Sequence, residues 1–203
     1  MKHANMTDGD RPPIVQAGDP VLRSRAREVL PAELATRDFQ LLVTAMVTAM
    51  REAPGVGLAA PQIGVPLRVI VLEDRHDLME RVAPEHLRER GRVPFPLQVI
   101  VNPVLVVTGT DRATFFEGCL SVRGYMALVE RHFSVEVTGL DEHGDPMSWR
   151  TEGWPARILQ HEVDHLDGAL YVDRMLTRSL CSNDEAQRWL DLPVGDVRKT
   201  LRT

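Results

Sequence analysis

The chain has 203 residues, 43% of them hydrophobic, and a formal net charge of −5. This length and apolar fraction suit one globular domain with a buried core, and no apolar run approaches the ~20 residues that a membrane span requires. The acidic balance and the lack of a basic stripe argue against direct binding to nucleic acid.

The cysteines and the N-terminal residues indicate where the protein is located and where its domain begins. The two cysteines, Cys119 and Cys181, are widely spaced in the sequence, which does not suit a disulfide framework and is typical of a reducing cytoplasm. Residues 1–12 contain no apolar segment and are not rich in Arg or Ser, so we expect neither a signal nor a transit peptide. We therefore predict a cytoplasmic protein with a flexible tail at 1–12 and a single domain at 13–203.

The first half of the chain begins with one predicted helix at 31–52, where apolar residues recur at helical spacing. The glycine-containing string at 55–64 predicts a loop that leads into an edge strand, and residues 67–73 predict a strand rich in β-branched residues. The charged stretch 74–96 is expected to be a solvated insertion with a short helix near 84–90.

The second half is predicted to hold strands at 98–109 and 113–118, then a strand pair or one long bent strand at 127–141 and a turn at 142–145. Residues 149–152 should lead into a helix at 153–168, and one short amphipathic helix is expected around 184–190. Strands that precede and separate two main helices predict an α+β domain rather than alternating βαβ units.

The predicted helix at 153–168 contains the string H-E-x-x-H, formed by His161, Glu162 and His165. Two histidines four residues apart lie on one helix face, so both imidazoles can reach one divalent metal. Glu162 projects at a different angle, from which it can approach a water molecule beside the metal. Histidines that merely pack in a buried helix are the alternative, but the adjacent Glu and the apolar flanks favour a metal site.

Two histidines leave a catalytic metal one protein ligand short of the usual three. Downstream, Tyr171 occupies the position of the third histidine in the metzincin pattern, and Glu185 is the only candidate for a thermolysin-like ligand. Upstream, Cys119 offers a thiolate, which is a strong ligand for zinc and ferrous iron. A small buried hydrophobe is the alternative for Cys119, and residue chemistry alone leaves this choice open.

The string GVGLAAPQIG at 55–64 also contains Gln62, a neutral side-chain N–H donor of the type that can hold an oxyanion. The string is not a phosphate-binding loop, because it has no Lys-Ser/Thr and lacks the third glycine of a dinucleotide fingerprint.

Three motifs in this order resemble the signature motifs of peptide deformylases: G-x-G-L-A-A-P-Q at 55–62, E-G-C-L-S at 117–121 and Q-H-E-x-D-H at 160–165. The likeness extends through shorter flanking strings, which include DPVL at 19–22, VNPVL at 101–105 and LYVDRM at 170–175. It therefore covers most of the chain, and it is closest to the branch shared by organellar and some bacterial deformylases.

The resemblance implies small antiparallel sheets packed around the central H-E-x-x-H helix. It also implies a metal-dependent hydrolase that removes the N-formyl group from the formylmethionine of nascent proteins and releases formate. Its implied metal ligands are Cys119, His161 and His165. Ferrous iron is the metal that the family favours, whereas the ligand types also suit zinc, nickel or cobalt.

Further roles follow from motif position in the family. Glu162 would transfer the proton of the water to the departing amine, while Gln62 and the backbone N–H of Leu120 would hold the oxyanion. N-formylmethionyl peptides are the expected partners, and the ribosome is a further candidate. The methionine slot is expected to involve Val56, Phe115 and Trp154, for each of which plain core packing is the alternative. Backbone pairing with the peptide is expected at Gly57, Gly124 and Tyr125.

Two residues depart from the S-V-P-G-x-R string that follows the cysteine motif in many deformylases. Arg123 replaces the proline, and Met126 stands where an arginine often contacts the peptide. These departures leave open how the protein grips the substrate backbone.

Two other functions would use the same helix. A zinc endopeptidase would need a downstream ligand, and Tyr171 at the decisive position counts against it. A non-catalytic metal-stabilised module would have a closed four-ligand site and would require neither Glu162 nor Gln62.

Overall fold

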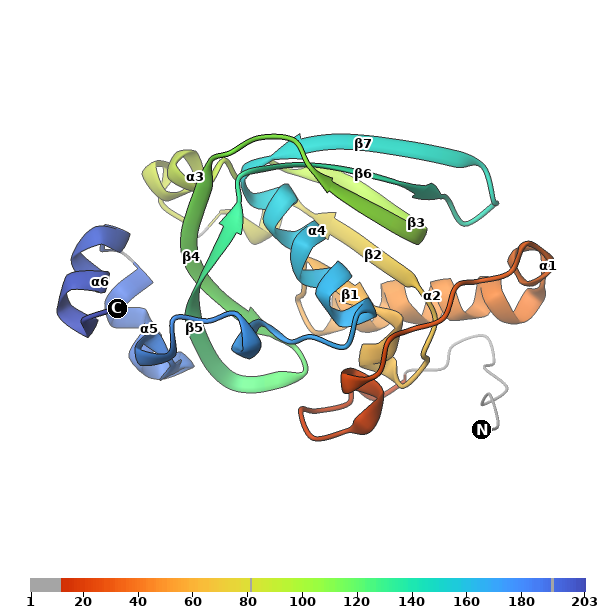
Figure 1. The fold of residues 1–203 in the computed structure, drawn as a ribbon, viewed down its shortest axis with the longest axis horizontal. Coiled ribbons are helices and arrows are strands. Elements are labelled where there is room, and N and C mark those ends of the chain that lie inside the picture. The colour runs from red at the N-terminus through yellow and green to blue at the C-terminus, as the bar shows by residue number, and fades with distance from the viewer. Residues whose placement is uncertain (1–11, 81, 191) are drawn as a thin grey trace.

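One helix, α4 (Gly153–Leu166), contacts strands of two antiparallel sheets (Figure 1). The computed structural model describes residues 12–80, 82–190 and 192–203, so nearly all of the tail predicted at 1–12 lies outside the described residues. The arrangement confirms the predicted α+β class with antiparallel sheets around the H-E-x-x-H helix.

The larger sheet has the order β1-β2-β3-β6-β7, and the smaller sheet has the order β4-β5-β8. The strands of the larger sheet are β1 (Gly57–Ala59), β2 (Val69–Asp74), β3 (Phe95–Val107), β6 (Ser134–Leu140) and β7 (Pro146–Glu152). Those of the smaller sheet are β4 (Arg112–Cys119), β5 (Val122–His132) and β8 (Cys181–Ser182). The remaining α-helices are α1 (Pro31–Leu34), α2 (Arg37–Glu52), α3 (Pro84–Arg90), α5 (Asn183–Leu190) and α6 (Val194–Leu201).

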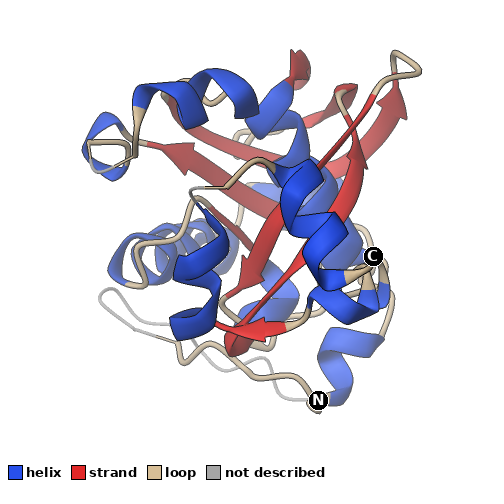
Figure 2. Ribbon diagram, turned by 90° about the vertical axis from the view of Figure 1, so that its left-hand side faces the viewer, coloured by secondary structure: helices blue, strands red, loops and turns tan. Residues whose placement is uncertain are grey.

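Around β2 the larger sheet is buried on both faces, as the alternation along this strand shows. Ile70 and Leu72 belong to the apolar cluster that includes α4, whereas Val69 and Val71 belong to the cluster that includes α2. Successive side chains of a strand point to opposite faces, so a continuous apolar run predicts a strand covered on both sides. Figure 2 shows helices on either side of the strands.

The predicted helix at 31–52 is two helices, and this part of the prediction is wrong. Thr36 has an extended backbone between α1 and α2, and its hydroxyl accepts a hydrogen bond from the N–H of Phe39 at 3.2 Å. A threonine in this conformation caps a helix N-terminus, so α2 begins anew at Arg37. The apolar periodicity belongs to α2 alone.

The predicted strand region 127–141 is divided between the two sheets. β5 ends at His132 and β6 begins at Ser134, so the chain passes from the smaller sheet to the larger one at Phe133. The residues predicted to lead into α4 are instead the end of β7, an edge strand whose side chains alternate between exposed and half-buried. Its polar composition hid the strand, because only Met147 and Trp149 pack inward against the α4 cluster.

The short helices near 84–90 and 184–190 are found as α3 and α5, whereas the sequence did not reveal β8 or α6. α6 packs through Val197 on an apolar cluster that includes Phe116 and Leu128 of the smaller sheet. The charged segment before β3 is less solvated than predicted, because Asp74 is fully buried and bonds to Arg92 through two 2.8 Å contacts. We propose from this packing that residues 13–203 form one domain.

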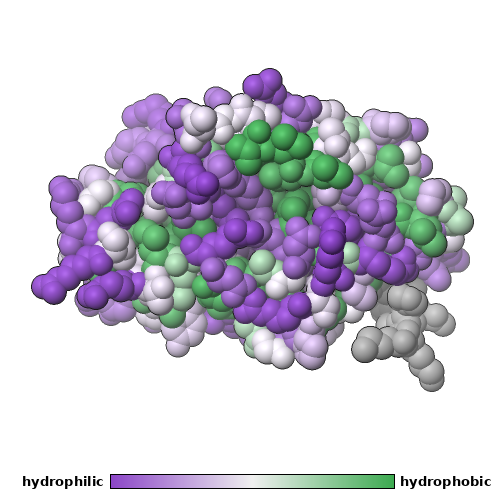
Figure 3. All heavy atoms as spheres, viewed as in Figure 1, coloured by the Kyte–Doolittle hydropathy of each residue, from purple (hydrophilic) through white to green (hydrophobic). Residues whose placement is uncertain are grey.

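The face seen in Figure 3 is mostly hydrophilic, with apolar areas between polar ones. β3 contributes exposed apolar side chains, namely Val104, Val106 and Val107. Within the part of the chain that the structure describes, the helices are too short or too polar to cross a bilayer.

Candidate metal centre

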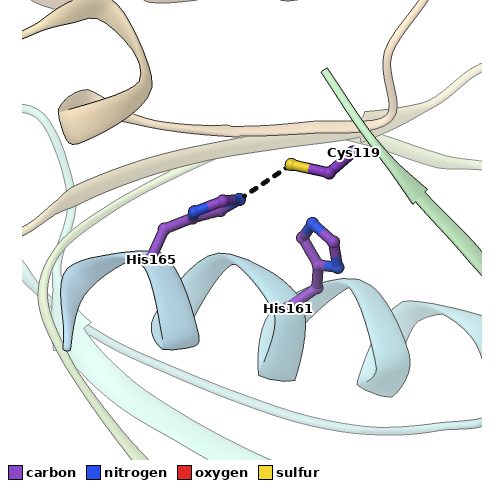
Figure 4. Close-up of side chains that lie close together, drawn as sticks. All are labelled: Cys119, His161 and His165. Atoms are coloured by element: carbon purple, nitrogen blue, oxygen red, sulfur yellow. Dashed lines mark hydrogen bonds between the residues drawn. The ribbon is translucent and has the colours of Figure 1, made fainter. Parts of the chain in front are cut away.

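Three donor atoms meet between α4 and the end of β4. The Sγ of Cys119 lies 3.2 Å from the Nε2 of His165, and the ligand atoms of Cys119, His161 and His165 all lie within 4.8 Å of one another. Figure 4 shows the two imidazoles rising from successive turns of α4 toward the cysteine. The four-residue spacing and the upstream thiol, two separate features of the sequence, therefore meet at one point.

The start of α4 requires a glycine, because any other residue at this position would be strained. Gly153 has a φ of +66°, and a Cβ at this position would lie 2.9 Å from the carbonyl oxygens of Arg90 and Gly91. Its N–H donates to the carbonyl of Phe133 at 2.8 Å. The helix that carries both histidines is thereby anchored to the α3–β3 connection and to the junction of the two sheets.

The donor set fits a divalent metal such as zinc or ferrous iron, because it combines one thiolate with two imidazoles. The Nδ1 of His161 bonds to the carboxylate of Glu117 at 2.9 Å, which leaves its Nε2 as the ligand atom. Burial lowers the pKa of His165 well below its ordinary value and so favours the neutral imidazole that metals require. Three protein ligands leave a position for water or substrate.

Glu117 is the centre of a buried ionic network beneath the metal ligands. It accepts hydrogen bonds from Arg131 at 2.9 Å, from Arg157 at 2.6 Å and from His161 at 2.9 Å. Burial alone would raise the pKa of Glu117, but the Arg131 hydrogen bond and charge outweigh it and hold that pKa well below its usual range. An ionised carboxylate behind a histidine ligand orients the ring and increases its basicity.

In the sequence, Glu117 stands out only as the first residue of the E-G-C-L-S motif, and no role was predicted for it. A usable signal was present, because Glu117 stands two residues before Cys119 on a predicted strand. Side chains at such positions point to the same face. Its two arginine partners lie 14 and 40 residues away in the sequence, so the network itself could not be foreseen.

Glu162 is the second buried carboxylate of the centre, and its surroundings differ. Its side chain is directed toward β1, where a Cβ added to Gly57 would lie 2.4 Å from the Glu162 Oε1. Among the described residues its Oε2 is buried without a hydrogen-bond partner, and burial raises the pKa of Glu162 to about 7. A carboxylate with these properties beside a metal site is a candidate proton acceptor.

Gln62 presents its amide nitrogen to the centre because its carbonyl oxygen is already engaged. The Oε1 accepts the N–H of Ala59 at 2.8 Å, while the Nε2 lies 3.5 Å from the Sγ of Cys119 and 3.3 Å from the hydroxyl of Ser121. Leu120 follows the cysteine and lines the adjoining cavity, and its carbonyl accepts a 3.0 Å bond from Gln16.

A cavity of about 610 Å³ opens beside the donor atoms. Its wall includes five of the residues predicted to contact substrate, namely Val56, Gly57, Gly124, Tyr125 and Trp154. Phe115 is absent from that wall and packs instead against Trp154, with ring centroids 6.5 Å apart, whereas Phe116 lines the cavity. Neighbouring residues of a strand face opposite sides, so Phe115 shares its face with Glu117 and Cys119, whereas Phe116 also packs in the apolar cluster that includes Val197 of α6. Phe115 therefore stays a prediction for the methionine slot.

The backbone positions expected to pair with a peptide differ in availability. Tyr125 already pairs with Ser182 of β8, and its carbonyl accepts a 3.0 Å hydrogen bond from the hydroxyl of Tyr171. Gly57 lies in β1, which is an edge strand of the larger sheet. Among these positions, Gly57 is therefore better placed than Tyr125 for pairing with an added strand.

The two downstream ligand candidates do not join the donor group formed by the described residues. Tyr171 is buried, burial raises its pKa further, and its hydroxyl is bonded to Tyr125. Glu185 lies in α5, where it forms an ion pair with Arg188 at 2.9 Å. This geometry gives the peptidase alternative no third ligand.

Comparison with known proteins identifies the family of this chain. The sequence model of the polypeptide deformylase family matches residues 12–180. The chain is 51% identical over 187 residues to peptide deformylase 1A of chloroplasts and mitochondria from Arabidopsis thaliana, an alignment that covers 92% of this chain and 68% of the relative. It is 53% identical to peptide deformylase 3 of Streptomyces avermitilis, over 87% of this chain and 77% of that protein.

Among solved structures, the Met-Ala-Ser-bound class I type b peptide deformylase of Acinetobacter baumannii superposes with a TM-score of 0.73 at 34% identity. The match covers 83% of this chain and 100% of that chain. The relatives include both organellar and bacterial members, as the motifs predicted. The chain belongs to the polypeptide deformylase family, the metal-dependent hydrolases that remove the N-formyl group from nascent proteins.

Proposed function

We propose that Cys119, His161 and His165 hold the catalytic metal of this deformylase and that Glu162 transfers the proton. The observation that carries the proposal is the meeting of three ligand atoms within 4.8 Å beside a buried carboxylate oxygen that has no partner among the described residues. The substrates are peptides that begin with formylmethionine, and the formyl group is released as formate.

When bound, a divalent metal supplies Lewis acidity, which makes a water molecule more acidic near neutral pH and polarises the formyl carbonyl. Glu162 accepts the proton of the attacking water and delivers it to the amine as the C–N bond breaks. The Gln62 amide and the Leu120 N–H donate to the oxygen of the tetrahedral intermediate. The bond between Gln62 and Ala59 holds the amide in this orientation before substrate arrives.

Ferrous iron is our proposal for the physiological metal, and zinc, nickel and cobalt fit the same ligands. One thiolate among three ligands supports a metal of intermediate softness rather than magnesium or calcium. Metal analysis of protein prepared without oxygen tests the assignment of ferrous iron. Replacement of the bound metal with each of the four ions then compares them.

The methionine side chain is proposed to occupy the apolar part of the cavity near Val56 and Trp154, where Phe115 packs against the Trp154 ring. The peptide backbone would add to the free edge of β1 at Gly57. The related Acinetobacter baumannii enzyme has been solved with Met-Ala-Ser bound, which supports a peptide in the corresponding place here.

We also propose a cytoplasmic location and the ribosome as a partner. The two described cysteines are unpaired, which suits a reducing compartment. α6 carries Arg198 and Lys199 in its last turn, and basic side chains favour contact with ribosomal RNA. Cosedimentation of the protein with ribosomes at low and high salt tests the second proposal.

The activity is tested by formate release from formyl-Met-Ala-Ser, with acetyl-Met-Ala-Ser as the control and metal content measured on the same sample. We expect turnover in proportion to one equivalent of metal and none with the acetylated peptide. A protein that holds the metal but releases no formate from any formyl-Met peptide would overturn the proposed function.

A further inference from the structure

The charged side chains that line the substrate cavity are unevenly distributed. The two carboxylates, Glu117 and Glu162, both belong to the metal centre and are buried. The other charged residues of the wall are all arginines, namely Arg90, Arg92, Arg123 and Arg157.

Two of these arginines are compensated by buried carboxylates. Arg157 bonds to Glu117 at 2.6 Å, and Arg92 is bonded at two points to Asp74, whose side chain is fully buried. Because each positive charge faces its own negative partner, neither is expected to select the charge of a substrate side chain strongly.

Arg123 differs from both because it is exposed at the cavity wall. Among the residues that the structure describes, its guanidinium forms no ion pair, and its backbone N–H donates to the Oε1 of Gln16 at 3.3 Å. The neighbouring Ser121 carbonyl accepts the N–H of Ala17 at 2.7 Å. The backbone that carries this charge is therefore anchored to the segment at residues 16–17.

The position of Arg123 relative to the metal ligands follows from the hairpin register. Cys119 is the register partner of Val122, the residue before Arg123. Partners in an antiparallel pair are about 5 Å apart, and one further residue adds about 4 Å, so the Cα atoms of Cys119 and Arg123 are at most about 9 Å apart. An extended peptide advances about 3.4 Å per residue, so its second and third residues come within reach of the arginine side chain.

We propose that Arg123 makes the enzyme favour formylmethionyl peptides with an acidic side chain at the second or third residue. This inference rests on the proposed function and adds a preference for substrate charge to it. An exposed ion pair of this kind changes kcat/KM by about 1.5- to 5-fold, and the effect weakens as salt screens the charges.

The test compares C-terminally amidated peptides that differ in one side chain: formyl-Met-Ala-Asp, formyl-Met-Ala-Asn and formyl-Met-Ala-Lys, with a second set that varies the residue after methionine. For the native protein we expect kcat/KM to fall in the order Asp, Asn, Lys in at least one set. Arg123→Gln should flatten the order, and Arg123→Glu should invert it. Raising the salt concentration should reduce each difference.

Arg37→Glu is a matched control, because it makes the same change in net charge on an exposed residue at the other end of α2 from the cavity. The 16 residues of α2 correspond to about 24 Å of helix. Arg37→Glu should leave the order of the peptides unchanged.

The outcomes separate the two proposals. Equal kcat/KM for the three peptides in both sets, or an order that survives Arg123→Glu, would overturn the preference while leaving the deformylase activity intact. Absence of formate from every peptide, the neutral Asn peptide included, would instead overturn the proposed function.

Discussion

Two buried carboxylates flank the metal centre on opposite sides of α4, and their surroundings assign them different properties. Glu117, on the smaller sheet, accepts hydrogen bonds from two arginines and a histidine, and its pKa lies well below the usual range. Glu162, directed toward β1 of the larger sheet, has a pKa raised by burial to about 7. Both carboxylates are buried, so the difference between their pKa values comes from the hydrogen-bond partners.

We propose a division of labour between the two carboxylates. A carboxylate held ionised by permanent partners suits the orientation of a ligand, since it has little tendency to take up a proton. A carboxylate that lacks such partners can gain and lose a proton during each turnover. Changes that disturb one side of α4 should therefore produce effects unlike those from the other side.

Among changes that leave both carboxylates in place, the largest effect is expected from Gly57→Ala, which acts on the Glu162 side. The new Cβ would lie 2.4 Å from the Oε1 of Glu162 and 2.9 Å from the Cγ2 of Ile158, so the carboxylate or the strand must move. A displacement of about 1 Å can cost about 100-fold in rate, and we expect kcat to fall by at least that factor with metal content retained. Steady-state kinetics with metal analysis measures both quantities.

The control for this variant is Gly195→Ala in α6, where a Cβ would meet no atom within 4 Å. It should leave kcat unchanged. Wild-type kcat in Gly57→Ala would show that the close approach of β1 to Glu162 has no part in catalysis.

Glu117→Gln is expected to have the next largest effect, on stability and on metal binding. It leaves Arg157 buried without its counter-charge and Arg131 with Asp164 alone, which should lower the free energy of unfolding by about 3–5 kcal/mol. Metal affinity should fall about 10- to 100-fold, because His161 loses the partner that orients it. Denaturant unfolding and metal competition with a chelator measure the two changes.

Glu130→Gln is the matched change at an exposed ion pair, in which Glu130 lies 3.2 Å from Arg112. It should alter the free energy of unfolding by less than about 1 kcal/mol. Equal losses of free energy of unfolding in Glu117→Gln and Glu130→Gln would contradict the importance given to burial.

Thr36→Ala should have a smaller effect, confined to stability. It removes the side-chain cap of α2, which is worth about 1 kcal/mol in free energy of unfolding. Thr44→Ala, at an exposed position within the same helix, should be neutral or slightly stabilising because alanine is the better helix former. Thermal or denaturant unfolding distinguishes them, and a larger loss in Thr44→Ala would refute the capping role.

The smallest effect is expected at Asp141, in the turn between β6 and β7. Backbone N–H donors from Asp145 and His143 lower the pKa of Asp141 in the folded chain. The resulting stability is present above the ordinary pKa of an aspartate and is lost as pH falls through the lower folded pKa. The difference in free energy of unfolding between wild type and Asp141→Asn should therefore shrink as the pH is lowered, and a constant difference would contradict this cause.

The grouping of the three candidate ligands was largely predictable from sequence, because two of them have helical spacing and the third lies in a family motif. The fold class followed from the order of strands and helices. The break at Thr36 was hidden by continuous apolar periodicity, and β7 was hidden by its polar composition. The partners of Glu117 come from distant parts of the chain, so no spacing in the sequence could indicate them.

The most direct test of the division of labour is a metal titration of Glu162→Gln and Glu117→Gln in parallel, with formate release followed at each metal concentration. We expect Glu162→Gln to bind metal like the native protein yet lose about 100- to 10,000-fold in kcat at saturation. Glu117→Gln should need more metal but recover most of its turnover once saturated. The same loss of kcat at metal saturation in both variants would contradict the account.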